Sequence, residues 1–326
     1  MANAPRGLVY YPDNRPGISR ERWGRGFSYR APDGTRIDRG AERNRIEALA
    51  VPPAYEDVWI CPADNGHLQA TGRDARLRKQ YRYHPTWTEY RAEQKYADLA
   101  EFGRRLPSIR RKVSRELSLD AGEHAFALAA VIAMIDQLSI RIGTPDYAAE
   151  NGTFGATTLT SRHLKLEEGD LFLAYKAKGG RKMRRTVSNR KLLRSLQALD
   201  DLPGAELVSW VDDDGAARSV RSEEVNEWLH DVTGSERMTA KTFRTWNGSV
   251  AALTAARSAD RVTIKAMAEA AAERLGNTAS IARKSYIHPA VIGLADGSTT
   301  MPEKAPDIRE LRRDERFLIE LLETES

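Results

Sequence analysis

The pattern of apolar residues changes near residue 86, and this change limits most strongly how the chain can fold. Before it, short runs of aromatic and β-branched residues alternate with turn sequences such as Pro32-Asp-Gly34, which is typical of short strands. The candidate strands are residues 27–29, 35–37, 58–60, 67–70 and 80–83. After residue 86 the segments have helical length and composition. We therefore predict a β-rich domain over residues 1–88 and a mainly helical domain over residues 89–326.

The helical half contains one expected interruption. Two extended runs, residues 171–175 and 183–187, flank Lys178-Gly-Gly180, which predicts a β-hairpin. The candidate helices are residues 41–50 in the first half and 89–105, 108–117, 122–140, 189–199, 222–232, 240–257 and 262–275 in the second, with a terminal helix carrying Leu311, Leu318 and Leu322. The predicted fold class is α+β, with a small β-rich N-terminal domain and a larger, mainly α-helical domain.

Composition excludes several classes of protein. Apolar residues make up 41% of the 326 residues, which supports a core and argues against a disordered chain. The longest apolar stretch, residues 124–135, is shorter than the ~20 residues that span a bilayer, so we expect no membrane-spanning segment. The N-terminus lacks an apolar signal core, and the single cysteine, Cys61, excludes intramolecular disulfides. These features favour a cytoplasmic protein.

Basic residues gather in two places, although the net charge is only +5. Residues 171–199 carry nine Lys or Arg and no acid, and residues 104–115 carry six and again no acid. A solvated surface explains one such cluster equally well. Two clusters favour a polyanionic partner, most simply nucleic acid.

The sequence lacks the common cofactor and metal motifs. It contains no GxxxxGK[ST] loop, no GxGxxG after a strand, no HExxH pair and no GxSxG turn. We therefore expect no cofactor and no metal. Chemistry on a nucleic acid would then depend on side chains alone.

Four segments supply such side chains. Arg141 follows a strongly apolar helix, Lys178 lies at the tip of the hairpin, and Arg244 lies near a helix start. Asn277 and Tyr286 share one C-terminal segment. Taken singly, each is more typical of a surface, capping or packing residue than of a catalytic one, so only their order and spacing carry a functional argument.

In that order, the segments resemble the type IB DNA topoisomerases, specifically the poxvirus-like and bacterial branch. The resemblance covers roughly residues 20–295 and includes both halves of the chain. Its motifs are Arg45-Ile-Glu-Ala-Leu-Ala-Val-Pro-Pro53, Asn65-Gly-His-Leu-Gln-Ala-Thr-Gly-Arg-Asp74, Arg78-Lys-Gln-Tyr-Arg-Tyr-His84, Arg141-Ile-Gly143, Lys241-Thr-Phe-Arg-Thr-Trp246 and Arg283-Lys-Ser-Tyr-Ile-His-Pro289.

The resemblance implies a role for each candidate. Tyr286 would attack a DNA phosphodiester and form a 3′-phosphotyrosyl link. Arg141 and Arg244 would hold the non-bridging oxygens, because guanidinium groups stay charged and present paired donors. Lys178 would protonate the leaving 5′-oxygen as general acid, and Lys241 matches a family lysine implicated in the same proton transfer. The implied activity is relaxation of positive and negative supercoils without ATP or metal.

One position departs from part of the family. Poxvirus and eukaryotic members carry a histidine nine residues before the tyrosine, where this chain has Asn277. Some bacterial relatives also carry asparagine there. An amide donates a hydrogen bond to a phosphate oxygen but brings no charge and moves no proton. We therefore predict Asn277 to be an orienting donor.

The resemblance also implies a C-shaped clamp in which the two domains close around duplex DNA. The implied DNA contacts are Arg78, Lys79, Tyr81, Tyr83 and Tyr147, although structural packing is an equally good explanation for each tyrosine. A clamp with one nucleophile acts as a monomer without an obligate protein partner. Its location would be the bacterial nucleoid in the cytoplasm.

Two other readings remain open. A tyrosine site-specific recombinase shares the same catalytic groups, but it usually has a histidine where this chain has Lys241, and its DNA-binding domain is commonly helical. A non-catalytic DNA-binding descendant would have lost part of the polar set, whereas every expected role has a candidate residue here.

Overall fold

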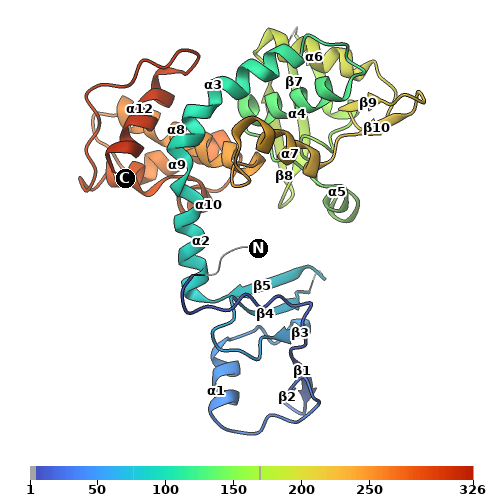
Figure 1. Cartoon of the computed structure of the whole chain (residues 1–326), viewed down its shortest axis with the longest axis vertical. Helices are drawn as coiled ribbons and strands as arrows, with labels where there is room; N and C mark the ends of the chain where they lie inside the picture. The colour runs from blue at the N-terminus through green and yellow to red at the C-terminus, as the bar shows by residue number, and fades with distance from the viewer. Residues whose placement is uncertain (1–4, 76, 169, 326) are drawn as a thin grey trace. The chain divides into compact units, whose positions relative to one another are not determined.

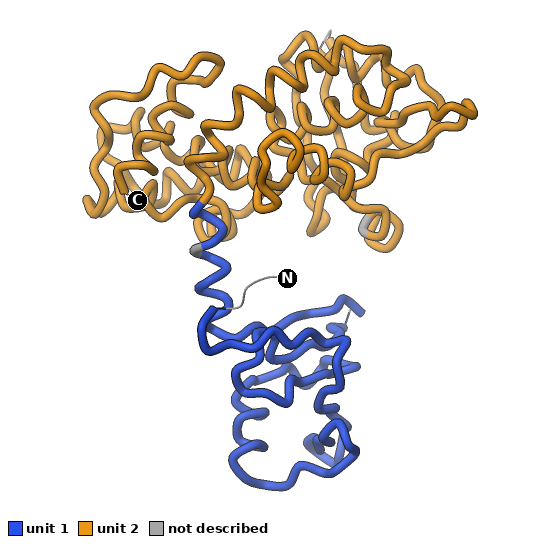
Figure 2. The backbone as a smooth tube through the Cα atoms, in the orientation of Figure 1, with its two compact units in different colours: residues 1–97 blue, residues 98–326 orange. Residues whose placement is uncertain are grey.

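The computed structural model describes residues 5–75, 77–168 and 170–325, apart from the side chains of residues 93 and 147. The chain forms two compact units, Met1–Ala97 and Asp98–Ser326 (Figure 2). The smaller unit is built on an antiparallel sheet and the larger is mainly helical, which confirms the predicted α+β class. The composition change near residue 86 marks the end of the sheet, and one further helix belongs to the smaller unit.

The smaller unit contains a five-stranded antiparallel sheet in the order β2-β1-β3-β4-β5 (Figure 1). Its elements are β1 (Ile18–Trp23), β2 (Gly26–Arg30), α1 (Ala41–Ala48), β3 (Glu56–Ile60), β4 (Leu68–Arg73), β5 (Lys79–Tyr83) and α2 (Pro85–Ala97). Ile46 of α1 packs with Ile18, Val58, Ile60 and Ala70 of the sheet in a small buried core. This unit therefore has an apolar core of its own.

The predicted strands at 27–29, 58–60, 67–70 and 80–83 are confirmed. Residues 35–37 form no full strand but only an isolated bridge to β2, between Arg30 and Arg36, while β2 pairs along its length with β1. In β1 only Ile18 is buried, so the strand shows no alternating apolar pattern. Its place in the sheet follows from backbone pairing and from the burial of Ile18 against Ile60.

The larger unit is organised around a buried helix, α4 (His124–Leu138). Apolar residues cover all faces of α4, and such a helix is stable only inside a core. Helices α3, α6, α7 and α8 pack against it. The helices of this unit besides α4 are α3 (Leu99–Glu116), α5 (Pro145–Asn151), α6 (Arg190–Asp200), α7 (Ser222–Thr233), α8 (Ala240–Ser258), α9 (Ile264–Leu275), α10 (Ala279–Tyr286), α11 (Pro289–Gly293) and α12 (Arg313–Thr324), with a short 3-10 turn at Ser161–His163.

Two small sheets complete the larger unit. One is β6 (Leu164–Glu167), β7 (Asp170–Ala177) and β8 (Arg181–Thr186), and the other is β9 (Ser209–Val211) with β10 (Ala217–Ser219). The predicted hairpin is confirmed as β7 paired with β8. The pair β9 and β10 was not predicted.

The predicted helix bounds between residues 89 and 117 are wrong. The break falls at Asp98, between α2 and α3, and Pro107 lies inside the continuous helix α3. A proline inside a helix costs roughly 3 kcal/mol, but α3 buries Phe102, Leu106 and Ile109, which together offset that cost. Within the described residues, no helix combines the length and apolarity needed to cross a membrane.

Candidate active site

Most of the residues predicted to be catalytic come together in the larger unit. Three of its helices meet there, because α8, α9 and α10 all pack against one another, and the C-terminal end of α4 reaches the same place through α8. The site is therefore assembled from segments more than a hundred residues apart in the sequence.

Arg244 is the buried centre of this site. It lies in the second turn of α8 and is only 3% exposed. Its guanidinium donates hydrogen bonds to the carbonyls of Ser139 and of Leu275, the latter at 3.0 Å, and lies 3.4 Å from Oδ1 of Asn277. Nε of Arg244 has no hydrogen-bond partner among the described residues. A buried donor without a partner is costly, which indicates a place for an acceptor.

Arg141 is presented by the turn that ends α4. Ser139 adopts a left-handed conformation, with φ of 54°, and this reverses the chain direction so that its carbonyl faces Arg244. Asn247 of α8 fixes the turn by donating to Oγ of Ser139 at 3.0 Å. Arg141 then donates through Nη2 to Oδ1 of Asn277 at 2.8 Å.

Asn277 links the two arginines. It follows Gly276, which ends α9 with φ of 63°, and it is only 6% exposed. Its Oδ1 accepts from both Arg141 and Arg244. Because guanidinium groups only donate, the amide nitrogen of Asn277 must point away from them, and Nδ2 is buried without a partner in the described part of the chain. The site thus holds a second unused donor.

Tyr286 is the last residue of α10 and lies against Arg244. The guanidinium carbon of Arg244 is 5.1 Å from the centre of the Tyr286 ring. Burial raises the pKa of the Tyr286 hydroxyl, but the charge of Arg244, a hydrogen bond with Arg244 and the charges of Arg141 and Lys241 outweigh burial, so the pKa is lowered from 10.0. The site therefore favours the phenolate, which is the more nucleophilic form.

The environment of the site also changes the pKa of Arg244. Burial, followed by the positive charge of Arg141, lowers the pKa of Arg244 from 12.5 to about 10. The group is still protonated at neutral pH, so the site keeps two close positive charges that no carboxylate balances among the described ion pairs. Such a site attracts an anion.

Two residues that position Tyr286 were not predicted. A Cβ on Gly248 of α8 would stand 2.9 Å from the carbonyl oxygen of Tyr286 and 3.1 Å from its Cβ, so only glycine allows this close helix contact. Ser249 donates through Oγ to the Tyr286 carbonyl at 3.3 Å and accepts from the backbone N–H of His288 at 2.9 Å. The signal in the sequence was a glycine inside a helix, one turn after Arg244.

The hairpin of β7 and β8 extends from this site. Tyr175 of β7 is buried, and burial raises its pKa, while the charges of Arg185, Arg244 and Arg141 oppose that rise. These interactions place Tyr175 next to the arginines. Lys178 lies three residues further on, exposed in the turn between the strands. The cluster thus consists of Arg141, Arg244, Asn277 and Tyr286, with Lys241 acting on Tyr286 through charge and Lys178 on the adjoining hairpin.

Three of the predicted DNA contacts share one face of the smaller unit. Lys79, Tyr81 and Tyr83 alternate along β5, an edge strand, and alternate residues of a strand point to the same side. The rings of Tyr81 and Tyr83 are half-exposed and stacked, with centroids 6.1 Å apart. Nζ of Lys79 lies 5.7 Å from the Tyr81 ring centroid. Part of each ring therefore faces solvent.

The other two predicted contacts differ. Arg78 forms an ion pair with Asp74 at 2.6 Å, a local contact within the loop that precedes β5. Tyr147 belongs to α5, but its side chain lies outside the described part of the structure.

Histidines have structural roles in this chain. Nδ1 of His67, His163 and His288 each accepts a backbone N–H. Among the described residues, no group of three or more His, Cys, Asp or Glu side chains is placed to hold a metal ion.

Comparison with known proteins assigns the family. Residues 84–288 match the catalytic core of eukaryotic DNA topoisomerase I, a stretch that includes all six predicted catalytic residues and ends just after Tyr286. The chain belongs to the type IB DNA topoisomerase family. Residues 26–74 match the N-terminal domain of bacterial DNA topoisomerase IB, so both units of this topoisomerase carry family sequence.

A related viral protein supports the same family assignment. The topoisomerase is 27% identical over 286 residues to DNA topoisomerase 1B of Acanthamoeba polyphaga mimivirus, and the alignment covers 83% of this chain and 85% of the viral protein. The protein is accordingly a type IB topoisomerase, a DNA-binding enzyme of the isomerase class.

Proposed function

We propose that this enzyme relaxes positive and negative supercoils by cutting and resealing one strand of duplex DNA through a 3′-phosphotyrosyl intermediate on Tyr286. The observation that carries the proposal is the pairing of Tyr286 with Arg244, beside two buried donors, Nε of Arg244 and Nδ2 of Asn277, that lack partners in the described structure. A phosphodiester next to the Tyr286 hydroxyl supplies the missing acceptors.

The chemistry follows from the charges. The Tyr286 oxygen bonds to phosphorus while the bond to the 5′-oxygen breaks, and negative charge grows on the non-bridging oxygens. Arg141 and Arg244 stabilise that charge, because they are fixed before the reaction by hydrogen bonds to Asn277 and to backbone carbonyls. The lowered pKa of Tyr286 eases loss of its proton.

The leaving 5′-oxygen requires a proton, and we assign Lys178 as its donor. An exposed turn at the end of a two-stranded hairpin is able to enter a DNA groove, and Lys241 adds a second ammonium group whose charge acts on Tyr286. Religation is the reverse reaction. The phosphotyrosine keeps the energy of the broken bond, so neither ATP nor a metal is needed.

We further propose that the smaller and larger units both contact the duplex, with Lys79, Tyr81 and Tyr83 touching DNA from the smaller unit. One Tyr286 suffices for one cut, so the enzyme acts as a monomer. Its substrate places it on the nucleoid in the cytoplasm.

The test is relaxation of positively and negatively supercoiled plasmid in excess EDTA without ATP, with Tyr286→Phe measured in parallel. The wild type should relax both signs. Tyr286→Phe should lose relaxation and the denaturant-stable DNA adduct while keeping DNA affinity, because only the nucleophilic oxygen is removed.

Retention of the covalent adduct by Tyr286→Phe would remove Tyr286 from the role of nucleophile. Failure of the wild type to relax plasmid, with salt-sensitive DNA binding intact, would favour a recombinase that needs a specific site.

A further inference from the structure

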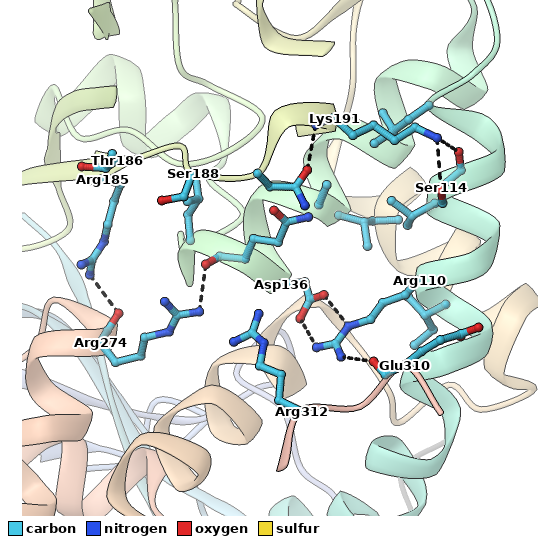
Figure 3. Close-up of a pocket in the computed structure, with 18 of the residues that line it drawn as sticks. Arg110, Ser114, Asp136, Arg185, Thr186, Ser188, Lys191, Arg274, Glu310 and Arg312 are labelled. Carbon is cyan, nitrogen blue, oxygen red and sulfur yellow. Dashed lines mark hydrogen bonds and ion pairs between the residues drawn. The ribbon is translucent and has the colours of Figure 1, made fainter. Parts of the chain in front are cut away.

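A cavity of about 740 Å³ lies in the larger unit (Figure 3). Its walls come from α3, α4, β8, the N-terminal end of α6, the end of α9 and the segment before α12. Arg141, Arg244, Asn277 and Tyr286 do not line it. The cavity is therefore distinct from the proposed catalytic site.

The lining carries six basic and two acidic side chains. Both acids already have arginine partners. Asp136 binds Arg110 at 2.9 Å, and Glu310 binds Arg111 at 2.9 Å. Glu315, which is buried next to the cavity, also binds Arg110, at 2.6 Å. The acids therefore cannot balance the remaining basic groups.

Four of those basic groups have no carboxylate partner among the described ion pairs. Arg185 donates to the backbone carbonyls of Glu273 and Arg274, and its Nε is buried without a partner in the described residues. Arg274 donates to the carbonyl of Gln137 at 2.8 Å. In Figure 3 the guanidinium groups of Arg274 and Arg312 extend into the same space.

Lys191 supplies the fourth group, from the first turn of α6. Its ammonium is bonded only to oxygens of Ser114 and Ser118. Burial and the positive charges of Arg312 and Arg185 lower the pKa of Arg274, and the charges of Asp136 and Glu315 oppose that shift without cancelling it. The cavity lining therefore keeps an excess of positive charge, which attracts an anion.

We propose that this cavity binds an anion bearing phosphate groups, held between Arg185, Arg274, Arg312 and Lys191. Guanidinium groups bind phosphate oxygens in pairs, and several such groups converging on one cavity suit a ligand with more than one phosphate. The volume is within the range of about 300–1,000 Å³ typical of small-molecule sites. The phosphate belongs either to a free polyphosphate compound or to the DNA backbone.

The experiment is calorimetric titration of the full-length enzyme with inorganic tripolyphosphate. Arg312→Gln and Lys191→Gln each remove one positive charge of the cavity and should weaken binding at least tenfold. Arg313→Gln is the matched control, because Arg313 is the next residue and is exposed like Arg312, but it does not line the cavity.

A second arm identifies the source of the phosphate. Tripolyphosphate binding and duplex binding then give different answers. If tripolyphosphate does not bind, but Arg312→Gln and not Arg313→Gln reduces the slope of log duplex affinity against log salt by about one, the cavity takes a DNA phosphate and the proposal stands. The proposal fails if neither binding nor salt dependence changes in Arg312→Gln, or if Arg313→Gln loses tripolyphosphate to the same extent.

Discussion

Asn277 shows how a neutral side chain contributes to a charged site. Its Oδ1 accepts from two arginines that repel each other, and its Nδ2 is left for another acceptor. The predicted role as an orienting donor stays a prediction, and the structure adds that Asn277 also fixes the arginines. A charged histidine at this position would repel Arg141 and Arg244, whereas an amide does not.

At the residue scale we expect a graded loss of activity. Asn277→Ala should slow single-turnover cleavage by roughly tenfold, because it removes a hydrogen bond from an uncharged side chain to a charged partner, worth about 1.5 kcal/mol. Arg141→Ala should slow it by on the order of 10²–10³, because it removes a preorganised charged donor.

The measurement is single-turnover cleavage of a short duplex at saturating enzyme, with DNA affinity determined separately. A larger loss in Asn277→Ala than in Arg141→Ala would mean that Asn277 does more than orient the phosphate and the arginines.

The hairpin of β7 and β8 connects the buried site to an exposed turn. Tyr175 is buried beside the arginines, while Lys178 lies just beyond it in the turn. Gly179 and Gly180 both have positive φ, 81° and 77°, and glycine adopts such angles without strain. The tight turn thus places Lys178 at the end of an anchored strand.

We predict that Lys178→Ala cleaves normal DNA slowly but cleaves DNA with a 5′-bridging phosphorothiolate at close to the wild-type rate. Sulfur is a better leaving group than oxygen, so the modified bond breaks without a general acid. Lys182→Ala, an exposed lysine of β8 in the same hairpin, is the control and should not show this selective rescue. Equal slowness of Lys178→Ala on both substrates would exclude the acid role.

The contact of α8 with α10 is the second feature at the element scale. We expect Gly248→Ala to reduce cleavage by about 10²-fold, because the added methyl group displaces Tyr286, and a shift near 1 Å costs about that much. The free energy of unfolding should change little, since overpacking and the better helix propensity of alanine oppose each other.

Gly122→Ala is the control, because a Cβ there meets only Val211 at an ordinary 3.9 Å. Single-turnover cleavage and thermal unfolding of both variants test the prediction. Normal cleavage by Gly248→Ala would show that this contact does not position Tyr286.

At the scale of the whole molecule, each unit has its own buried residues, and the described aromatic side chains that are exposed, Tyr10, Trp23, Tyr81 and Tyr83, all lie on the smaller unit. In the smaller unit, the contribution of charge to DNA binding can be measured separately from the contribution of the aromatic rings. Lys79 is paired with Asp13 at 2.5 Å and would exchange this partner for a phosphate. Tyr81 has no charge to exchange.

We therefore predict different salt effects for the two residues in duplex binding. Lys79→Gln should reduce the slope of log affinity against log salt by about 0.9, the value for one phosphate contact. Tyr81→Ala should weaken binding several-fold, the loss of one exposed ring contact, with the slope unchanged. Trp23→Ala removes another exposed aromatic group of this unit, on β1, and should leave both the duplex affinity and its salt slope unaltered. Identical slopes for Lys79→Gln and wild type would place Lys79 away from DNA.

The sequence by itself determined the elements whose pattern is local. The fully apolar stretch became the buried α4, Lys178-Gly-Gly became a hairpin turn, and Leu318 and Leu322 became the buried face of α12. Leu311 is also buried, but it precedes α12, so the prediction that it belongs to the terminal helix is wrong. The family followed from motifs that contain the reacting side chains, because chemistry fixes residue type and spacing more tightly than packing does.

The tertiary structure decided what depends on distant partners. β1 has a polar sequence and was found only through its pairing with β2 and β3. Gly248 matters because α10 passes close to it, and the cationic cavity exists because α3, β8 and α9 converge. Burial and charge act through space, so side chains far apart in the sequence influence one another only after the core has formed.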